Sequence, residues 1–211
     1  MKIIYEGGQG EIVEKKSRFI ATIRPAHSEE EAQTFIQEMK KKYWDARHNC
    51  SAYIIGRNRE VERCSDDGEP SQTAGRPMLE ILENAGIHDV VVVVTRYFGG
   101  TLLGTGGLVR AYQGAVQEGL KNCVIAEEGM GYPLKSSVDY TALGKIEYII
   151  REMDIPVMEQ NYEEMVKFSL MVPSEQKKSF EEKVIEATSG GIKIEWSDEV
   201  PYVLMDGKVL I

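Results

Sequence analysis

The chain has 211 residues, of which 42% are hydrophobic and 28% are charged, a composition typical of folded proteins and not of disordered ones. Its formal net charge of −9 argues against tight non-specific binding to phosphate backbones. No apolar run approaches the roughly 18 residues that a membrane span needs, so no membrane partner is expected. Three widely spaced cysteines suit a reducing cytoplasm.

The periodicity of apolar residues predicts the elements of the first part of the chain. Alternation indicates strands, and apolar residues at helical spacing indicate helices. Ser28 and Glu31 form a capping box at the start of the first helix, and the valine run after His88 predicts a strand buried on both faces. In chain order we expect a strand over 11–24, a helix over 28–43, strands near 49–56 and 60–65, a helix near 77–85, a strand over 88–98 and a helix over 106–121.

The pattern restarts near residues 124–131. From there strand-like and helix-like segments follow in the order β-α-β-β-α-β over about 80 residues, which is typical of the ferredoxin-like unit, and the last is one strand over 192–204. We therefore predict an α+β protein with two domains, residues 1–128 and residues 129–211. Residues 1–130 hold 16 basic and 19 acidic side chains, whereas residues 131–211 hold 9 and 15, so a local basic face is compatible only with the first part.

A glycine-rich segment, RYFGGTLLGTGGLVR, follows the predicted buried strand at residues 96–110. A turn into a helix exposes unpaired N–H groups, where the helix dipole favours an anion. Glycines at the turn permit close approach of a ligand to the backbone, Thr105 is the predicted N-cap, and the flanking arginines match a phosphate or a carboxylate. The predicted anion-binding residues are Arg96, Gly104, Thr105, Gly106, Gly107 and Arg110.

Two interpretations of this segment stay open. Neither nucleotide-binding template fits, because GxGxxG fails at Val109 and no lysine follows as GxxxxGK[ST] requires. The segment either binds an anion or is a strand-to-helix corner whose arginines pair with nearby acids. No nucleotide cofactor is expected in either case.

Residues 66–70, DDGEP, form an acidic loop that carries Asp66, Asp67 and Glu69. Their carboxylates are of the type that holds Mg²⁺ or Ca²⁺, but the spacing does not match an EF-hand. No nucleophile can be identified beside them for acid–base catalysis. We expect no metal here, and a loop that supports the site. The expected partners of its carboxylates are backbone N–H groups and the arginines Arg76, Arg96 and Arg110.

A thiol mechanism would need Cys50 as the nucleophile and His48 as its base. The two residues lie on the same face of a predicted strand as neighbours, not as an oriented dyad, and no third orienting group can be identified. Cys64 lies beside the acidic loop, where negative charge raises the pKa of a thiol and lowers its reactivity. Thiol catalysis is therefore not expected.

Four motifs, KKSRF (15–19), AxHNC (46–50), DDGEPSxTAGxPML (66–79) and VVTRYFGGxxLGxGGLVRAY (93–112), resemble the IMPACT family, specifically its two-domain bacterial YigZ-type branch. A glycine commonly sits where this chain has Gln72. The resemblance implies a first domain similar to the fourth domain of elongation factor G and to related ribosomal-protein domains, and a second that is ferredoxin-like. Eukaryotic members regulate translation during amino-acid starvation by competing for a protein that activates an initiation-factor kinase.

These observations lead to one hypothesis with two alternatives. The hypothesis is a non-enzymatic, translation-associated or regulatory protein that binds RNA or the ribosome through the Arg/Gly-rich loop. Arg47 and Arg76 would extend the basic face, and Tyr97, Phe98 or Tyr112 would offer stacking surfaces. The alternatives are a module that binds a translation-linked protein without nucleic acid, and an enzyme for a small anionic substrate. The oligomeric state is open, with a homo-oligomer among the options.

Overall fold

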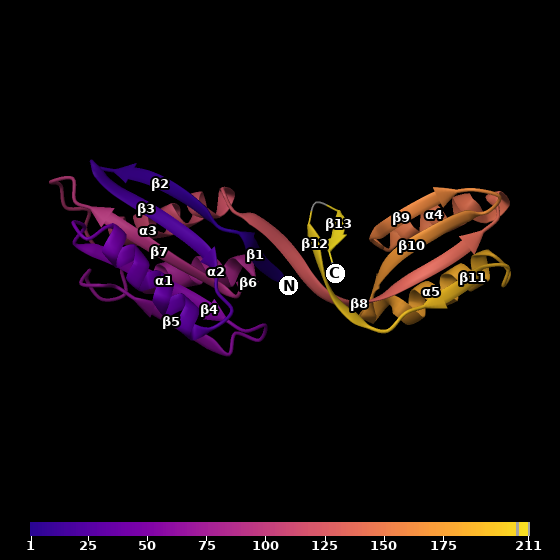
Figure 1. Ribbon diagram of the computed structural model, residues 1–211. Helices are drawn as coiled ribbons and strands as arrows, with labels where there is room; N and C mark the ends of the chain where they lie inside the picture. The colour runs from indigo at the N-terminus through magenta and orange to yellow at the C-terminus, as the bar shows by residue number, and fades with distance from the viewer. Residues whose placement is uncertain (206, 211) are drawn as a thin grey trace. The chain divides into compact units, whose positions relative to one another are not determined.

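A computed structural model describes residues 1–205 and 207–210, and its contacts divide the chain into two compact units, Met1–Ala126 and Glu127–Ile211 (Figure 1). Both units mix helices with β-sheet. The long strand β8 (Val124–Val138) begins in the first unit and continues into the second. The predicted boundary between residues 128 and 129 falls within this strand. No helix in the described ranges is long and apolar enough to cross a membrane.

The N-terminal unit is built on an antiparallel sheet with the strand order β2-β3-β7-β4-β5. These strands are β2 (Gly8–Glu14), β3 (Ser17–Pro25), β4 (His48–Ile55), β5 (Val61–Ser65) and β7 (Val90–Tyr97). A short parallel pair joins β1 (Lys2–Glu6) to β6 (Ile87–His88). The valine run therefore forms the central strand.

Helices cover both faces of this sheet, which explains why β7 is apolar on both sides. Successive side chains of a strand point to opposite faces. Val91 and Val93 pack with α1 (Glu29–Lys42) in one core cluster. Val92 and Val94 pack in another with α2 (Gly75–Ala85) and α3 (Thr105–Lys121). The predicted burial on both faces is confirmed, although β7 lies in an antiparallel sheet.

The single strand predicted over 11–24 is wrong. The segment belongs to a hairpin of β2 and β3, in which Glu14 pairs with Ser17. Lys15 and Lys16 make the turn with φ angles of 46° and 68°. Tight hairpin turns require positive φ and usually carry Asn-Gly or similar pairs, so two lysines give no local turn signal.

In the C-terminal unit, β8 pairs antiparallel with β10 (Val166–Pro173) on one side and β11 (Lys193–Trp196) on the other. β9 (Val157–Tyr162) extends the sheet beyond β10. The helices α4 (Tyr140–Glu152) and α5 (Lys177–Ala187) supply Ile146, Phe180 and Val184 to the core of this unit. A short 3₁₀ turn, Ser174–Gln176, precedes α5.

The single closing strand predicted over 192–204 is also wrong. β11 ends at Trp196, which pairs with Leu134 of β8, and β12 (Val200–Met205) begins at Val200, which pairs with Gly131. Between these pairs the chain takes four steps while β8 takes three, so the strand must leave the ladder there. A last strand, β13 (Lys208–Leu210), pairs with β12.

Candidate functional site

An open cavity of about 840 Å³ lies where β7 ends in the N-terminal unit. Its wall comes from the start of β4, the acidic loop, the end of β7 and the approach to α3. Of the predicted site residues, Arg47, Glu69, Arg96, Gly104 and Thr105 line it. The other lining residues are Asp45, His48, Gly68, Pro70, Tyr97, Phe98, Leu102, Leu103 and Leu108. The remaining predicted residues lie outside the wall: Asp66, Asp67, Arg76, Gly106, Gly107 and Arg110.

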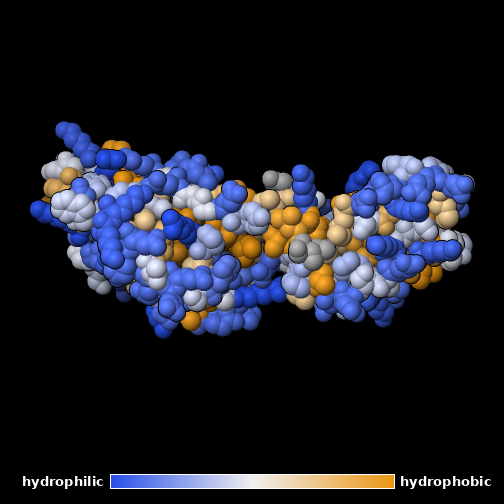
Figure 2. Space-filling view, in the orientation of Figure 1, coloured by the Kyte–Doolittle hydropathy of each residue, from blue (hydrophilic) through white to orange (hydrophobic). Residues whose placement is uncertain are grey.

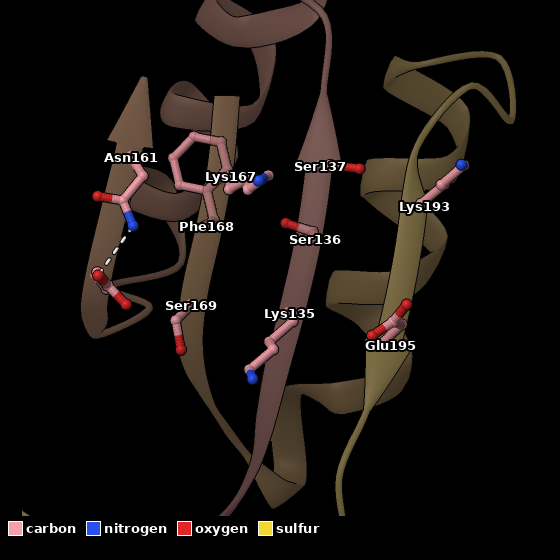
Figure 3. Close-up of a pocket in the computed structure, with 10 residues that line it drawn as sticks. Lys135, Ser136, Ser137, Asn161, Lys167, Phe168, Ser169, Lys193 and Glu195 are labelled. Atoms are coloured by element: carbon pink, nitrogen blue, oxygen red, sulfur yellow. Dashed lines mark hydrogen bonds between the residues drawn. The ribbon is translucent and has the colours of Figure 1, made fainter. Parts of the chain in front are cut away.

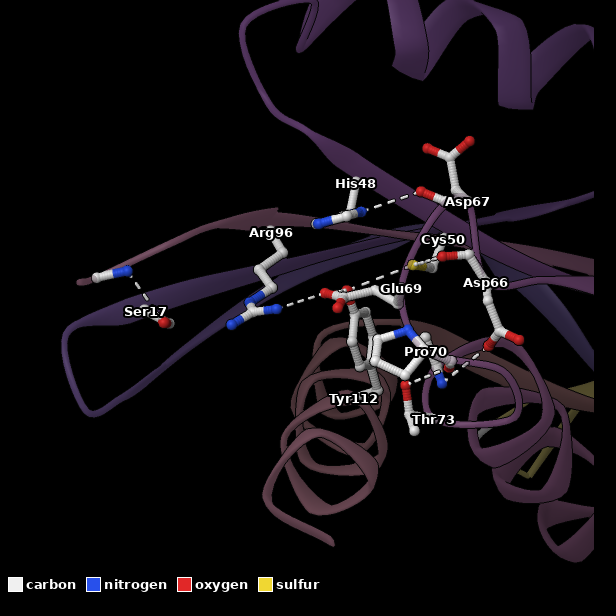
Figure 4. A network of polar contacts seen from close by, with 12 residues as sticks. Ser17, His48, Cys50, Asp66, Asp67, Glu69, Pro70, Thr73, Arg96 and Tyr112 are labelled. Atoms are coloured by element: carbon white, nitrogen blue, oxygen red, sulfur yellow. Dashed lines mark hydrogen bonds and ion pairs between the residues drawn. The ribbon is translucent and has the colours of Figure 1, made fainter. Parts of the chain in front are cut away.

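Arg96 and Glu69 form a buried ion pair in this wall (Figure 4). Arg96 Nη1 lies 2.6 Å from Glu69 Oε1, and the two side chains are only 7% and 3% exposed. The same carboxylate oxygen accepts a hydrogen bond of 2.8 Å from the Tyr112 hydroxyl. Arg96 Nε has no hydrogen-bond partner among the described residues. The pair fixes the acidic loop against β7 and α3.

Tyr112 and Cys50 continue this network into the core. The Cys50 thiol contacts the backbone oxygen of Asp66 at 3.0 Å and the Tyr112 hydroxyl at 3.3 Å. Burial raises the pKa of both groups. His48, the neighbour of Cys50 on this strand, has its Nδ1 3.0 Å from the backbone oxygen of Asp67. The stacking role predicted for Tyr112 is wrong, because the ring is fully buried.

Asp66 and Asp67 hold the acidic loop in shape. Asp66 Oδ1 accepts hydrogen bonds from the N–H groups of Ala74 and Gly75 at the start of α2, and Asp66 Oδ2 accepts one from Gln72. Asp67 Oδ2 accepts from the N–H of Asn49, and Oδ1 pairs with the Lys40 ammonium at 2.6 Å.

The carboxylates of the acidic loop therefore form hydrogen bonds and ion pairs with neighbouring backbone N–H groups and side chains. Residues 1–205 and 207–210 contain no group of three or more acidic, histidine or cysteine side chains arranged to hold a metal.

Gln72 is the residue that departs from the family pattern. It is exposed and has a φ of 61°, a left-handed conformation that glycine adopts more easily.

The start of α3 differs from the prediction in its cap. Thr105 is not the N-cap; Gly104 occupies that position with φ 70° and ψ 169°, and no side chain caps the helix. A residue with a side chain is strained at this φ, so the N-cap position favours glycine. The N-cap therefore lies one residue before the predicted Thr105. Residues 104–106 are exposed, so the uncapped start of α3 lies at the surface beside the cavity.

Four exposed cations surround this end of the unit. Arg47 lines the cavity, and Arg110 lies one turn into α3 beside Gly106. The Lys15–Lys16 turn touches the loop after β7, since a Cβ on Gly99 would lie 2.0 Å from the carbonyl carbon of Lys16. We call Lys15, Lys16, Arg47 and Arg110 the basic rim. Within the described chain none of the four forms an ion pair.

Arg76 does not join the basic rim. Its guanidinium lies 3.2 Å from Glu80 and 3.1 Å from Glu83 on its own helix, α2. The two lysines of the rim escaped sequence reasoning because the hairpin that places them was not recognised. Only their position in the KKSRF motif singled them out.

Exposed apolar side chains accompany the basic rim. Phe98 is 53% exposed and Leu102 is 82% exposed, and both line the cavity. In Figure 2 the surface at the end of the N-terminal unit that carries this loop is mostly hydrophilic with small apolar areas. Residues 90–117 contain no aspartate or glutamate although the chain is acidic as a whole. The site therefore joins unpaired cations to an apolar wall, a combination suited to an anionic ligand with a flat apolar part.

A second cavity, of about 320 Å³, lies on the side of the C-terminal sheet where Lys135, Lys167 and Lys193 stand on β8, β10 and β11 (Figure 3). Glu159 and Glu195 line it as well. The Lys167 ammonium already lies 2.6 Å from Glu163. This face carries both lysine and glutamate side chains and therefore does not define a ligand class.

Comparison with known proteins gives consistent matches. Residues 15–120 match the Impact N-terminal domain, and residues 137–190 match a domain of unknown function, DUF1949. The chain is 47% identical over 187 residues to the IMPACT family member YvyE of Bacillus subtilis, covering 89% of this chain and 86% of the relative. It is 33% identical over 182 residues to the IMPACT family member YigZ of Escherichia coli, covering 85% and 89%. A crystal structure described as that of a hypothetical protein is 31% identical with a TM-score of 0.58, covering 92% of this chain and 95% of the other.

Proposed function

This chain belongs to the IMPACT family, as its motifs predict, and we propose that it is a translation-associated regulatory protein that binds RNA, free or within the ribosome. The binding surface in this proposal is the cavity at the end of β7 together with the basic rim. The link to translation is what the family resemblance implies. The partner system of eukaryotic members is not assumed for this chain.

The observation that carries this proposal is the set of four unpaired cations on a strongly acidic protein. The net charge is −9, yet Lys15, Lys16, Arg47 and Arg110 lie at the same end of the N-terminal unit and form no ion pair in the part of the chain that the structure describes. Exposed cations that neutralise phosphates supply most of the affinity for nucleic acid. The main chain at residues 104–107 adds a helix start whose N–H groups no side chain caps.

The role of Arg96 in this proposal is indirect. Its Nη1 already binds Glu69, so we assign the main phosphate contacts to Arg47 and Arg110 and leave Arg96 as part of the cavity wall. Binding is favoured over catalysis because the carboxylates of the acidic loop are occupied by Arg96, Tyr112, Lys40 and backbone N–H groups.

The finer fold assignments belong to the same proposal. The strand order β11-β8-β10-β9, with antiparallel neighbours and two helices, supports a ferredoxin-like C-terminal unit. We also propose that the N-terminal unit resembles the fourth domain of elongation factor G, which the family motifs imply.

A cytoplasmic location is part of the same proposal. The free thiols Cys50, Cys64 and Cys123 support it.

A filter-binding titration with RNA at several salt concentrations tests the proposal. Arg47→Ala and Arg110→Ala are each expected to weaken binding and to flatten the dependence of log K on log salt by about 0.7, the value per phosphate contact on a single strand. The control is Lys178→Ala, a lysine of α5 with a 90% exposed side chain. Wild-type protein that does not bind RNA at low salt contradicts the proposal.

A second candidate function is docking of a translation-linked protein. Phe98 and Leu102 favour it, because exposed apolar side chains on a loop are common in protein interfaces. This function predicts a defined partner that is retained after nuclease treatment and lost in Leu102→Ser. Capture that disappears with nuclease treatment contradicts it.

A further inference from the structure

Resting on the proposed RNA-binding function, we infer that the cavity at the end of β7 takes one unstacked base, so that the protein binds single-stranded RNA more tightly than duplex. The base would lie against Phe98 and Leu102, and its phosphate would lie at the start of α3 beside Arg47. Phosphate contacts alone do not distinguish single-stranded RNA from duplex. The base pocket is the feature that would select the single strand.

The cavity has the size and lining for such a guest. Its volume of about 840 Å³ falls within the range of about 300–1,000 Å³ that is typical of small-ligand sites. Pro70, Leu103 and Leu108 supply apolar wall, and the half-exposed ring of Phe98 supplies an aromatic surface. Every base has a π-face, so an aromatic wall accepts a base without reading its identity.

The buried network holds this aromatic surface in place. The guanidinium carbon of Arg96 lies 5.4 Å from the centre of the Phe19 ring and 5.6 Å from that of the Phe98 ring. Arg96 is itself fixed by Glu69, and Glu69 by Tyr112. A ring held by a cation that cannot move loses little conformational freedom when a base stacks on it, and this favours binding.

The phosphate end of the site rests on two observations. Gly104 and Thr105 line the cavity at the uncapped start of α3, where N–H groups attract anions. Arg96 lines the same cavity, is 7% exposed and has an Nε without a partner among the described residues. Its Nη1 binds Glu69, so the guanidinium supports this wall, and the exposed Arg47 on the same wall supplies the charge for a phosphate.

Charge favours RNA over a protein side chain as the guest. Asp45 is the exposed acid of the wall, and its carboxylate already accepts a hydrogen bond of 2.8 Å from the Tyr97 hydroxyl. The basic rim has no such partners. A duplex cannot insert a base, because each base is stacked and paired, so only unpaired nucleotides reach the apolar wall.

Fluorescence anisotropy with labelled oligonucleotides of about 12 nucleotides, a common site size, tests the inference. One probe is single-stranded oligo-adenosine, and the other is a blunt RNA duplex of the same length. We expect at least a ten-fold preference for the single strand.

Phe98→Ala is expected to lower single-strand affinity about ten-fold and to leave duplex affinity unchanged. Phe98→Trp should retain binding and Phe98→Leu should lose most of it, because stacking needs a ring. Tyr148→Ala, another exposed aromatic on the C-terminal unit, is the control.

The outcomes separate this inference from the proposed function. Equal affinity for both probes, with Arg110→Ala still weakening binding, overturns the base pocket and leaves RNA binding intact. Absence of RNA binding by the wild type overturns both. Loss of affinity in Phe98→Ala that is the same for duplex and single strand also overturns the base pocket, because the ring would then act only through loop structure.

Discussion

The buried ion pair of Arg96 and Glu69 sets the chemistry of the site at the scale of single residues. Removing two charges from water is costly, and their attraction offsets this only when further hydrogen bonds satisfy the pair. Here Tyr112 supplies one such bond to Glu69, and the rings of Phe19 and Phe98 flank the guanidinium. Breaking the pair leaves an uncompensated buried charge, so either partner alone should be hard to replace.

We therefore expect Arg96→Met to lower the free energy of unfolding by about 3–5 kcal/mol. Adding Glu69→Gln to this variant should restore part of the loss, with a coupling of about 1–3 kcal/mol, because the remaining carboxylate charge is removed. Urea denaturation of both single variants and the double variant measures this. Arg76→Ala, which breaks an exposed contact on α2, is the control and should change stability little. Simple additivity of Arg96→Met and Glu69→Gln would contradict the coupling.

At the scale of elements, the loop after β7 depends on its contact with the β2–β3 hairpin. The Gly99 N–H donates to Ser17 Oγ at 3.0 Å, and a Cβ on Gly99 would lie 2.0 Å from the Lys16 carbonyl carbon. Such a distance requires backbone to move. The contact links the rim lysines to Phe98 and Leu102, so the hairpin and the loop form one surface.

Gly99→Ala is expected to destabilise the protein by roughly 1–3 kcal/mol, the usual range for overpacking, and to weaken RNA binding by displacing the loop. Gly106→Ala is the matched control for stability, because its Cβ would meet only Arg110 Nη1 at an ordinary distance of 3.6 Å. Thermal unfolding of the two variants compares them. A tolerated alanine at Gly99 would show that the loop is not held against the hairpin.

Sequence reasoning recovers strongly periodic elements and fails where a structure depends on distant contacts. The valine run and the helix after Gly104 are evident because every position has a consistent pattern. The Lys15–Lys16 turn is not, because its residues lack turn propensity and the sheet imposes the geometry. The sequence names Arg96 among the possible partners of the acidic-loop carboxylates, but it cannot single out Glu69 as the one that lies 2.6 Å away.

At the scale of the whole molecule, the acidity of the chain limits how the basic rim can act. Residues 131–211 hold 9 basic and 15 acidic side chains, which oppose RNA at long range. At physiological salt, charges are screened beyond about 8 Å, so the rim acts on phosphates that are already close. Affinity should therefore come from short contacts at one end of the N-terminal unit, with a modest salt dependence set by few phosphates.

Amide hydrogen exchange with and without saturating single-stranded RNA measures directly where the nucleic acid binds. The account predicts slower exchange in peptides covering 96–110, 14–18 and 44–48, where the cavity and the basic rim lie, and unchanged exchange in α4 and β10. Protection confined to the C-terminal unit, or no protection over 96–110 while RNA is bound, would contradict it.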